Sequence, residues 1–362
     1  MLLLPLLLVW RRVIHRQITL TTHAAVLMML VSIIITNYNY GDFLAQAIDS
    51  ALGQTWPDKE VIVVDDGSTD QSADVIESYG NSITAVFKGN EGQCSAANAG
   101  FEISRGDIVI FLDSDDYLME GAVSALAGPI VEDPSVSKCQ GYLMAISSAG
   151  TPTGQTIPKR LSPSGDYRDK ALLNGPDTCR FAYTSGNAWP RWFLEQVMPL
   201  PVPKIKRMGV DGYLNAVSTL FGRTVSVNQI VAAYRIHGSN QGPVSTIFTE
   251  ESLRQRANLI EMTQDHFLRW ARRLEYTVSP DDMKRWGKGW RHSLLNYSLN
   301  AMAESPQRIS FAELVMSPFH SCHTNTLRAL YLSASLSILW LLPYSAGLEL
   351  ARWMLKLPRP AS

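Results

Sequence analysis

Apolar runs rich in isoleucine and valine alternate with helical patterns in the first third of the chain, and acidic residues follow two of these runs directly. The runs are residues 31–36, 60–64 and 107–112, with Asp65-Asp66 after the second and Asp113-Ser114-Asp115-Asp116 after the third. Strands that are apolar throughout and separated by helices predict a parallel sheet covered on both faces. Because ligands bind beyond the carboxyl ends of such strands, the acidic clusters predict a functional site at that edge.

The rest of the chain extends this pattern. Apolar spacing and capping residues predict one further strand and five helices: 83–87 for the strand, and 42–52, 71–79, 96–103, 246–273 and 281–303 for the helices. Between residues 121 and 238 the pattern is mixed. The expected fold class is therefore α/β, with a mostly parallel central sheet flanked by helices and a helical C-terminal extension.

Composition and charge exclude several classes of protein. The 362 residues are 46% apolar and 18% charged, which provides for a sizeable core and is unlike a disordered chain. The net charge of −1 gives no basic surface, so we expect no nucleic-acid partner. The four cysteines are widely spaced and never form CxxC, so we expect reduced, mostly buried thiols rather than a disulfide framework or a zinc site.

The pair Asp113-x-Asp115 is the clearest chemical signal in the acidic clusters. No GxGxxG follows a strand and no GxxxxGK[ST] occurs, so dinucleotide and P-loop sites lack their phosphate-binding loop. Two carboxylates on a turn after a strand instead offer hard oxygen ligands to Mg²⁺ or Mn²⁺, which normally complete their shell with substrate phosphates and water. For this pair taken alone, a solvated acidic turn is the alternative interpretation.

Four stretches together resemble one known family: SIIITNYN (32–39), VIVVDDGSTD (61–70), Asn90-x-Gly92 and FLDSDD (111–116). Their order, separations and strand-end positions are similar to those of the inverting family 2 glycosyltransferases, over about residues 30–240. The resemblance implies a glycosyltransferase-A fold, a nucleotide-diphosphate sugar as donor, with a UDP-sugar expected first, and a divalent metal, Mn²⁺ or Mg²⁺. It further implies transfer of one sugar to a glycan or lipid-linked acceptor, in cell-surface polysaccharide or glycolipid synthesis.

The resemblance assigns the nucleotide to residues at the ends of the first, second and fourth predicted strands. These residues are Thr36, Tyr38 and Asn39 beside base and ribose, Asp65 as acceptor from the base imide N–H, and Asp113 on the ribose side. Asp115 corresponds to the direct metal ligand. Asp116 corresponds to a donor-sugar contact or, alternatively, to a cap of the next helix, and Asp66 is expected to shape its turn.

The second half of the resemblance supplies a catalytic base and a further metal ligand. Asp211, in the segment MGVDGYL (208–214), corresponds to the base that takes the proton of the acceptor hydroxyl, with an ordinary helix N-cap as the alternative. In YRIHGSN (234–240), His237 corresponds to a metal ligand or diphosphate contact and Arg235 to a nearby cation at donor sugar or acceptor. Gly186 and Asn187 resemble the loop near the donor sugar and the acceptor, although Gly-Asn is also good turn chemistry.

The chain departs from the family pattern at three positions. Ala97 stands where family members often have an arginine, so a basic contact near the donor is missing. Val210 replaces the acidic neighbour usual before the base, and Glu120 replaces a common proline. The first two departures weaken the match around the donor and the base, and the third is neutral.

Three other functions share part of this pattern. A processive polysaccharide synthase shares the donor site but carries Gln-x-x-Arg-Trp, whereas Arg191-Trp192 and Arg269-Trp270 lack the glutamine at that spacing. A nucleotidyltransferase needs a basic, glycine-rich loop after the first strand, and here that loop is NYNYG (37–41). An inactive nucleotide-binding scaffold at the membrane gives no reason to combine Asp65, Asp113, Asp115, Asp211 and His237 in one chain.

The predicted organisation has four parts. Residues 1–28 are an N-terminal extension, interpreted as a mis-assigned start with the true start at Met28 or Met29, or alternatively as a membrane-surface anchor. Residues 29–240 form the catalytic domain, with a nucleotide-binding half (29–120) and an acceptor half (121–240), followed by a helical extension (241–326). Residues 327–362 form an apolar membrane-associated segment, because 329–348 carry no charge. A re-entrant helix pair, a single span and a buried helix are the alternatives for this segment. We expect the protein to be located in the cytoplasm, at the inner face of the cell membrane.

Overall fold

The computed structural model gives a two-part chain. It describes residues 29–201, 209–237, 250–283, 286, 294–295, 297–299, 310, 314–315, 326–342, 347, 350–351 and 354. The first compact unit comprises the described residues of Met1–Gly165, Phe181–Asp211 and Gly222–Ile236. The second comprises those of Asp166–Arg180, Gly212–Phe221 and His237–Ser362.

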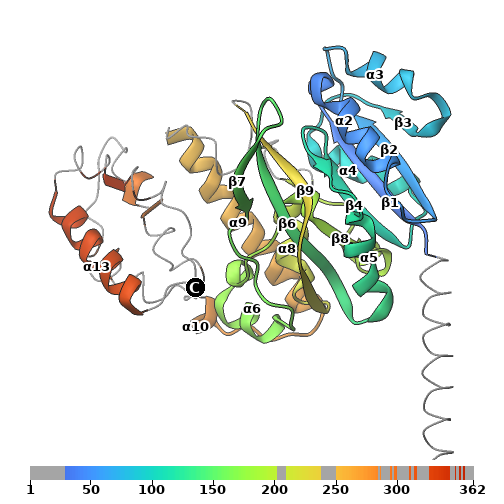
Figure 1. The fold of residues 1–362 in the computed structure, drawn as a ribbon. Coiled ribbons are helices and arrows are strands. Elements are labelled where there is room, and N and C mark those ends of the chain that lie inside the picture. Colours follow the sequence, from blue (N-terminus) through green and yellow to red (C-terminus); the bar gives the residue numbers. More distant parts are fainter. Residues whose placement is uncertain are drawn as a thin grey trace, which may run out of the picture. The chain divides into compact units, whose positions relative to one another are not determined.

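Four parallel strands build the first half of the sheet, in the order β3–β2–β1–β4 (Figure 1). Their bounds are Val31–Asn37 (β1), Lys59–Asp65 (β2), Thr84–Phe87 (β3) and Ile108–Asp113 (β4). The register sets Asn37 beside Asp65, and Thr36 beside Asp113. The predicted parallel sheet is therefore confirmed, and its acidic clusters do lie at carboxyl ends.

Helices cover both faces of these strands. They are α2 (Gly41–Leu52), α3 (Ser72–Ser78) and α4 (Gln93–Ile103), with the single-turn 3-10 helix η1 (Gly80–Ser82) before β3. Ile33 shares a core cluster with Leu44 of α2, whereas a Cβ added at Gly100 of α4 would lie 2.4 Å from Cγ2 of Ile34. Because neighbouring strand residues point to opposite faces, α2 and α4 lie on opposite sides of β1. The helix predicted at 96–103 in fact begins at Gln93.

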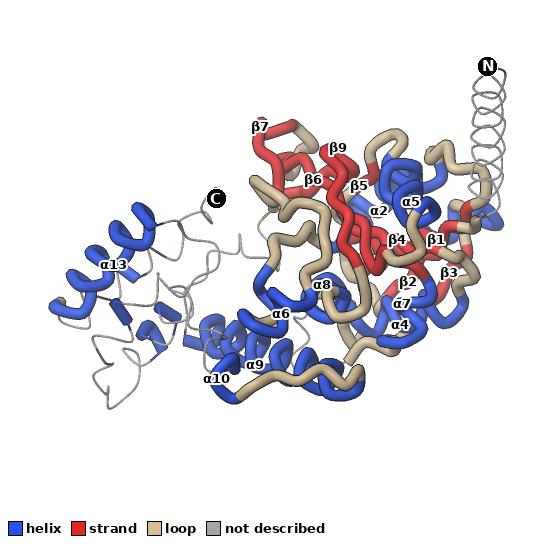
Figure 2. The backbone as a smooth tube through the Cα atoms, turned by 90° about the horizontal axis from the view of Figure 1, so that it is seen from below, coloured by secondary structure: helices blue, strands red, loops and turns tan. Residues whose placement is uncertain are grey.

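The second half of the sheet is mixed rather than parallel. Its strands are β5 (Tyr117–Leu118), β6 (Val136–Ser147), β7 (Pro152–Ile157), β8 (Asn187–Pro190) and β9 (Arg223–Ile236). β8 is antiparallel to both β4 and β6, while β6 and β9 are parallel. Figure 2 shows β6 and β9 side by side. β5 pairs with β9, so the chain that leaves β4 through the acidic turn runs directly to the end of β9.

The remaining described helices lie between the strands of the mixed half in the chain or come after them. They are α5 (Ala122–Glu132), α6 (Arg168–Asn174), α7 (Arg191–Val197), α8 (Val210–Ser218), α9 (Glu250–Arg273), α10 (Pro280–Met283), α13 (Thr326–Leu341), and the 3-10 turns η2 (Pro176–Thr178) and η3 (Thr184–Gly186). In the second unit, Phe267 of α9 packs with Leu220 and Trp286. Leu332, Leu336 and Leu339 of α13 pack in a separate cluster.

Several expectations about the ends fall partly or wholly outside the described residues. The extension 1–28 does so entirely, as do residues 238–249 and most of the helix predicted at 281–303. α13 occupies the first part of the charge-free segment 329–348. Within the described part of the chain, every helix is too short or too polar to cross a bilayer. Cys94, Cys139 and Cys179 are buried thiols, as expected.

Gly106, at the entry to β4, tests the close packing of this sheet. A Cβ there would lie 2.4 Å from the backbone N of Ser32 and 2.9 Å from the carbonyl O of Ile108, so Gly106→Ala must displace backbone. We expect a loss of about 1–3 kcal/mol in the free energy of unfolding, measured by urea denaturation. Gly89→Ala is the control, because nothing lies within 4 Å of its Cβ. Equal urea midpoints for the two variants would contradict this packing.

Candidate active site

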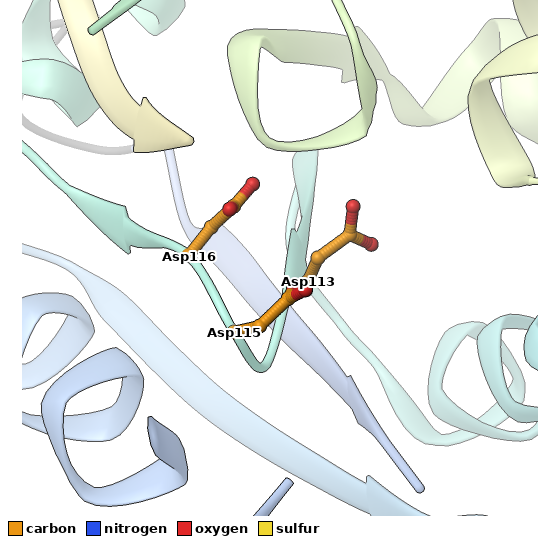
Figure 3. Close-up of side chains that lie close together, drawn as sticks. All are labelled: Asp113, Asp115 and Asp116. Atoms are coloured by element: carbon orange, nitrogen blue, oxygen red, sulfur yellow. The ribbon is translucent and has the colours of Figure 1, made fainter. Parts of the chain in front are cut away.

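Three aspartates crowd the turn that follows β4. One carboxylate oxygen from each of Asp113, Asp115 and Asp116 lies within 4.8 Å of the others, and together they form a group that could hold a metal ion (Figure 3). Asp113 ends β4, and the turn is closed by a bond from the N–H of Asp116 to the carbonyl of Asp113. The short turn thus brings three like charges together.

Burial and mutual repulsion both disfavour ionisation of this group. The pKa of Asp113 is raised well above its usual value, first by burial and then by the charges of Asp115 and Asp211. The pKa of Asp116, which is 2% exposed, is raised in the same way by burial and by the charges of Asp115 and Asp113. A bound cation would remove this repulsion, so the donor set fits a hard divalent metal.

Protein donors hold the turn in place. The Ser185 hydroxyl donates to Oδ2 of Asp116 (2.7 Å) and accepts from the N–H of Asp113 (3.2 Å). The N–H of Arg235 donates to Oδ1 of Asp116 (3.0 Å). Both oxygens of Asp116 therefore accept bonds from the protein, which indicates a structural role beside any contact with a donor sugar.

Asp65 is presented as a hydrogen-bond acceptor at the end of β2. Its Oδ1 accepts from Nδ2 of Asn37 (2.9 Å), and its Oδ2 accepts from the N–H of Ser68 (2.9 Å). Asp66 shapes the adjoining loop, since it accepts from Nζ of Lys88 (2.8 Å) and the N–H of Gly92 (2.7 Å).

The other predicted nucleotide residues lie around the same strand ends. Asn39 has a left-handed backbone (φ 59°), and its Oδ1 accepts from the N–H of Thr69 (2.7 Å), which joins the loops after β1 and β2. Tyr38 is 43% exposed, so its ring is accessible to a ligand. The Thr36 hydroxyl accepts from Nε2 of Gln93 (3.4 Å).

Asp211 lies near the acidic turn. It is the second residue of α8, and its charge contributes to the raised pKa of Asp113. The Gln93 amide donates to Oδ1 of Asp113. A Cβ added at Gly209 would lie near both Oε1 of Gln93 and Oδ1 of Asp211. The structure thus brings Asp113, Gln93 and Asp211 together in the first unit.

The remaining predicted site residues differ in their surroundings. Asn187 is fully buried, and its Nδ2 donates to the carbonyls of residues 182–184, including Tyr183 at 2.6 Å. A Cβ on Gly186 would meet Cδ1 of Leu143 at 2.6 Å, which explains the glycine by packing. Arg235 is 3% exposed and bonds to protein acceptors. His237 directly follows β9 and is half-buried. Substrate or metal contacts by these four stay predictions.

Sequence reasoning missed three residues that shape the site: Gln93, Ser68 and Tyr40. Burial and the charge of Asp115 raise the pKa of the Tyr40 phenol, which therefore lies close to the acidic turn. Ser68 lies within the quoted VIVVDDGSTD motif, and Gln93 directly follows the quoted Gly92. These residues could be seen in the sequence, but their bonding partners are up to 57 residues away in the chain.

Fold and site together define the class of the protein. At the carboxyl ends of its parallel strands, a mixed α/β sheet carries Asp65 as a hydrogen-bond acceptor and an acidic turn that could hold a metal ion. The carboxylate of Asp211 lies near this turn. This is the architecture of a nucleotide-sugar transferase. The family model for glycosyl transferase family 2 matches residues 32–185.

Comparison with curated proteins shows the family. The glycosyltransferase alr2836 of Nostoc sp. strain PCC 7120 is 34% identical over 257 residues, which cover 70% of this chain and 79% of that protein. The chain belongs to glycosyl transferase family 2. The Escherichia coli glucosyltransferase WfaP is 40% identical over 99 residues, 27% of this chain and 39% of WfaP.

A solved structure supports the fold. Residues 1–349 of Staphylococcus aureus TarS, in complex with UDP-GlcNAc, match with a TM-score of 0.51 at 16% identity, covering 90% of this chain and 92% of that one. The glycosyltransferase-A fold expected from the motifs is therefore confirmed.

The raised pKa of Asp113 predicts a pH-dependent stability penalty. Its folded-state pKa lies above the unfolded value of about 3.9, so ionisation costs stability as pH rises above that value. In EDTA we expect Asp113→Asn to melt higher than the wild type at pH 8, by about 2–4 °C for each kcal/mol of repulsion that the substitution removes. At pH 4 we expect this difference in melting temperature to disappear.

Asp133 provides a control of opposite sign. Hydrogen bonds from Ser135, with a smaller contribution from the charge of Arg223, lower the pKa of this carboxyl, so it stabilises the fold above the unfolded pKa. Asp133→Asn should therefore melt lower than wild type at pH 8. An Asp113→Asn variant that also melts lower at pH 8 would show that repulsion in the acidic turn is not the dominant effect.

Proposed function

We propose that this protein is an inverting, metal-dependent glycosyltransferase that moves one sugar from a nucleotide-diphosphate sugar to an acceptor hydroxyl. The observation that carries the proposal is the position of Asp211 near Asp113, at the edge where the acidic turn lies. A base for the acceptor and a group for the diphosphate are the two parts that such a transfer requires.

The nucleotide half of the site has support from Asp65 and its neighbours. A buried carboxylate held by the Asn37 amide is set to accept from an imide N–H, which uracil presents. Tyr38 offers an exposed ring for stacking on the base. Thr36, Asn39 and Asp113 stand on the same strand ends, consistent with contacts to base and ribose.

A divalent ion, Mn²⁺ or Mg²⁺, would be held by Asp115. The metal or diphosphate contact of His237 stays a prediction. When bound, such an ion neutralises charge that develops on a departing diphosphate. Asp113 and Asp116 lie close enough to Asp115 to shape its surroundings. On the side of the donor sugar and acceptor we propose Asp116, Gly186 and Asn187, while Arg235 supports this side through its bonds to the acidic turn.

Asp211 would act as the general base. Its carboxylate takes the proton of the acceptor hydroxyl while that oxygen attacks the anomeric carbon from the face opposite the diphosphate, so the configuration inverts. The attack forms the new C–O bond as the bond to the diphosphate oxygen breaks, and the leaving group departs as the nucleoside diphosphate.

The names of two similar proteins favour a UDP-sugar. TarS was solved with UDP-GlcNAc, and WfaP is named for UDP-Glc as donor and a diphosphoundecaprenol-linked sugar as acceptor. We therefore propose a UDP-sugar as donor and a glycan or lipid-linked acceptor, in cell-surface polysaccharide or glycolipid synthesis.

A thermal-shift screen tests the donor site. The protein is melted with UDP, GDP, dTDP and CMP, each with Mn²⁺ or with EDTA. A ligand that binds only the folded state raises the melting temperature. At a hundredfold excess over Kd it adds about 2.7 kcal/mol to the free energy of unfolding. We expect a Mn²⁺-dependent shift with UDP. Folded protein that shifts with none of the nucleotides would contradict the proposed donor site.

Two variants separate the proposed metal ligand from the proposed base. Asp115→Ala should remove the Mn²⁺-dependent UDP shift and metal-dependent activity together. Asp211→Asn, which keeps the size of the side chain, should retain the UDP shift and lose sugar transfer by about 100-fold or more. Loss of UDP binding to the same extent in both variants would contradict this division of roles.

We also propose that the protein works in the cytoplasm at the inner face of the cell membrane, with peripheral contact through 329–348. One face of α13 is apolar and exposed: Leu330, Ile338 and Leu341 are 54%, 56% and 69% exposed. Interfacial helices bury such a face at the headgroup boundary.

Vesicle binding tests this contact. Co-sedimentation with vesicles of phosphatidylglycerol and phosphatidylethanolamine should fall when Leu330, Ile338 and Leu341 are all changed to Ser. Wild-type protein that stays in the supernatant would rule the contact out.

A further inference from the structure

Arg235 makes an unusual set of contacts for a buried cation. Its side chain is 3% exposed, its Nε donates to the carbonyl of Asp115 (2.9 Å), and its Nη1 donates to the carbonyl of Ser148 (3.0 Å). Nη2 donates to Oε1 of Gln46 in α2 (2.6 Å), and the guanidinium lies 4.6 Å from the centre of the Phe43 ring. One side chain therefore ties the end of β9 to α2, to the β6–β7 hairpin and to the acidic turn.

Arg235 also contacts the turn through its backbone. Its N–H donates to Oδ1 of Asp116 (3.0 Å), while its Nε reaches the carbonyl of the preceding residue, Asp115. The Ser185 hydroxyl bonds to the other oxygen of Asp116 and accepts from the N–H of Asp113, so the residues on both sides of Asp115 are held by the protein. The direction in which Asp115 presents its carboxylate then depends on these bonds.

We propose that Arg235 is a positioning residue that presets the acidic turn for its metal ion, rather than a contact to donor sugar or acceptor. This inference rests on the proposed metal-dependent function. Side chains that orient the ligands of a metal typically contribute 10–100-fold to its affinity. The guanidinium also brings a positive charge to the turn through its bond to the carbonyl of Asp115, where low-dielectric surroundings make each charge count for more.

Both the charge and the shape of arginine are needed for this role. A guanidinium is planar and donates in fixed directions, so it can reach the carbonyls of Asp115 and Ser148 and the amide of Gln46 at once. A lysine ammonium keeps the charge but is a single point with a different reach. Arg235→Lys and Arg235→Gln therefore separate the geometric part of the effect from the electrostatic part.

A matched control lies at the opposite end of β4, where this strand begins. Arg191, the first residue of α7, donates from Nε to the carbonyl of Gly106 (2.5 Å) and from Nη2 to the Ser104 hydroxyl (2.7 Å). Its guanidinium lies 4.8 Å from the centre of the Phe101 ring. Arg191 thus bonds to a carbonyl, a side-chain oxygen and a ring, as Arg235 does, but at the residues that enter β4 rather than those that leave it.

The experiment measures Mn²⁺ affinity by isothermal titration calorimetry on the full chain, with UDP present, and the melting temperature in EDTA. We expect Arg235→Lys and Arg191→Lys both to melt lower than wild type. We expect only Arg235→Lys to weaken Mn²⁺ binding, by about 10-fold or more, and Arg235→Gln to weaken it further. Gln46→Ala, which removes one partner of Arg235, should weaken Mn²⁺ binding less and serves if the arginine variants do not fold.

Each result has a defined meaning. Arg235→Lys and Gln46→Ala with wild-type Mn²⁺ affinity would overturn the positioning role and leave the proposed function intact. An equal loss of affinity in Arg191→Lys would overturn it too, because the effect would then follow stability alone. Wild-type protein that binds no Mn²⁺ in the presence of UDP would overturn the proposed metal-dependent function, and this inference with it.

Discussion

Repulsion among Asp113, Asp115 and Asp116 is the interaction on which the rest of the site depends. Three carboxylates within 4.8 Å, two of them with strongly raised pKa values, oppose folding at neutral pH. The turn is tolerated because the buried strand β4 leads into it and because Ser185 and Arg235 bond to it from outside. Such a local cost is typical of a site that gains stability when its ligand binds.

The parallel half of the sheet explains why the functional residues converge. β1, β2 and β4 are neighbours in register, so residues that follow them meet although they are far apart in the chain: Asn37 bonds to Asp65, and Thr36 is paired with Asp113. The antiparallel β8 and the parallel β6–β9 pair then return the chain to the same edge, where Ser185 and Arg235 contact the acidic turn. The fold thus joins the parallel half of the sheet to a mixed half that supports the acidic turn.

Much of this could be predicted from sequence, because short-range composition decides it. Apolar runs gave β1, β2 and β4, and the DxD spacing located the acidic turn. What could not be predicted depends on long-range contacts. Arg235 reaches Gln46 across 189 positions, and Gln93 reaches Asp113 only because α4 begins three residues earlier than its apolar pattern indicates. Asn187, chosen as a loop residue, is a buried support for its own turn.

Electron paramagnetic resonance of Mn²⁺ tests most directly whether the acidic turn is a metal-dependent nucleotide site. Free Mn²⁺ in water gives a six-line spectrum that broadens when the ion is bound. Adding the protein with UDP should remove the free signal at a ratio of one ion per chain, and the Asp115→Ala variant should leave it in place. A free signal that wild-type protein does not diminish, or that the variant removes equally well, would contradict a metal site at this turn.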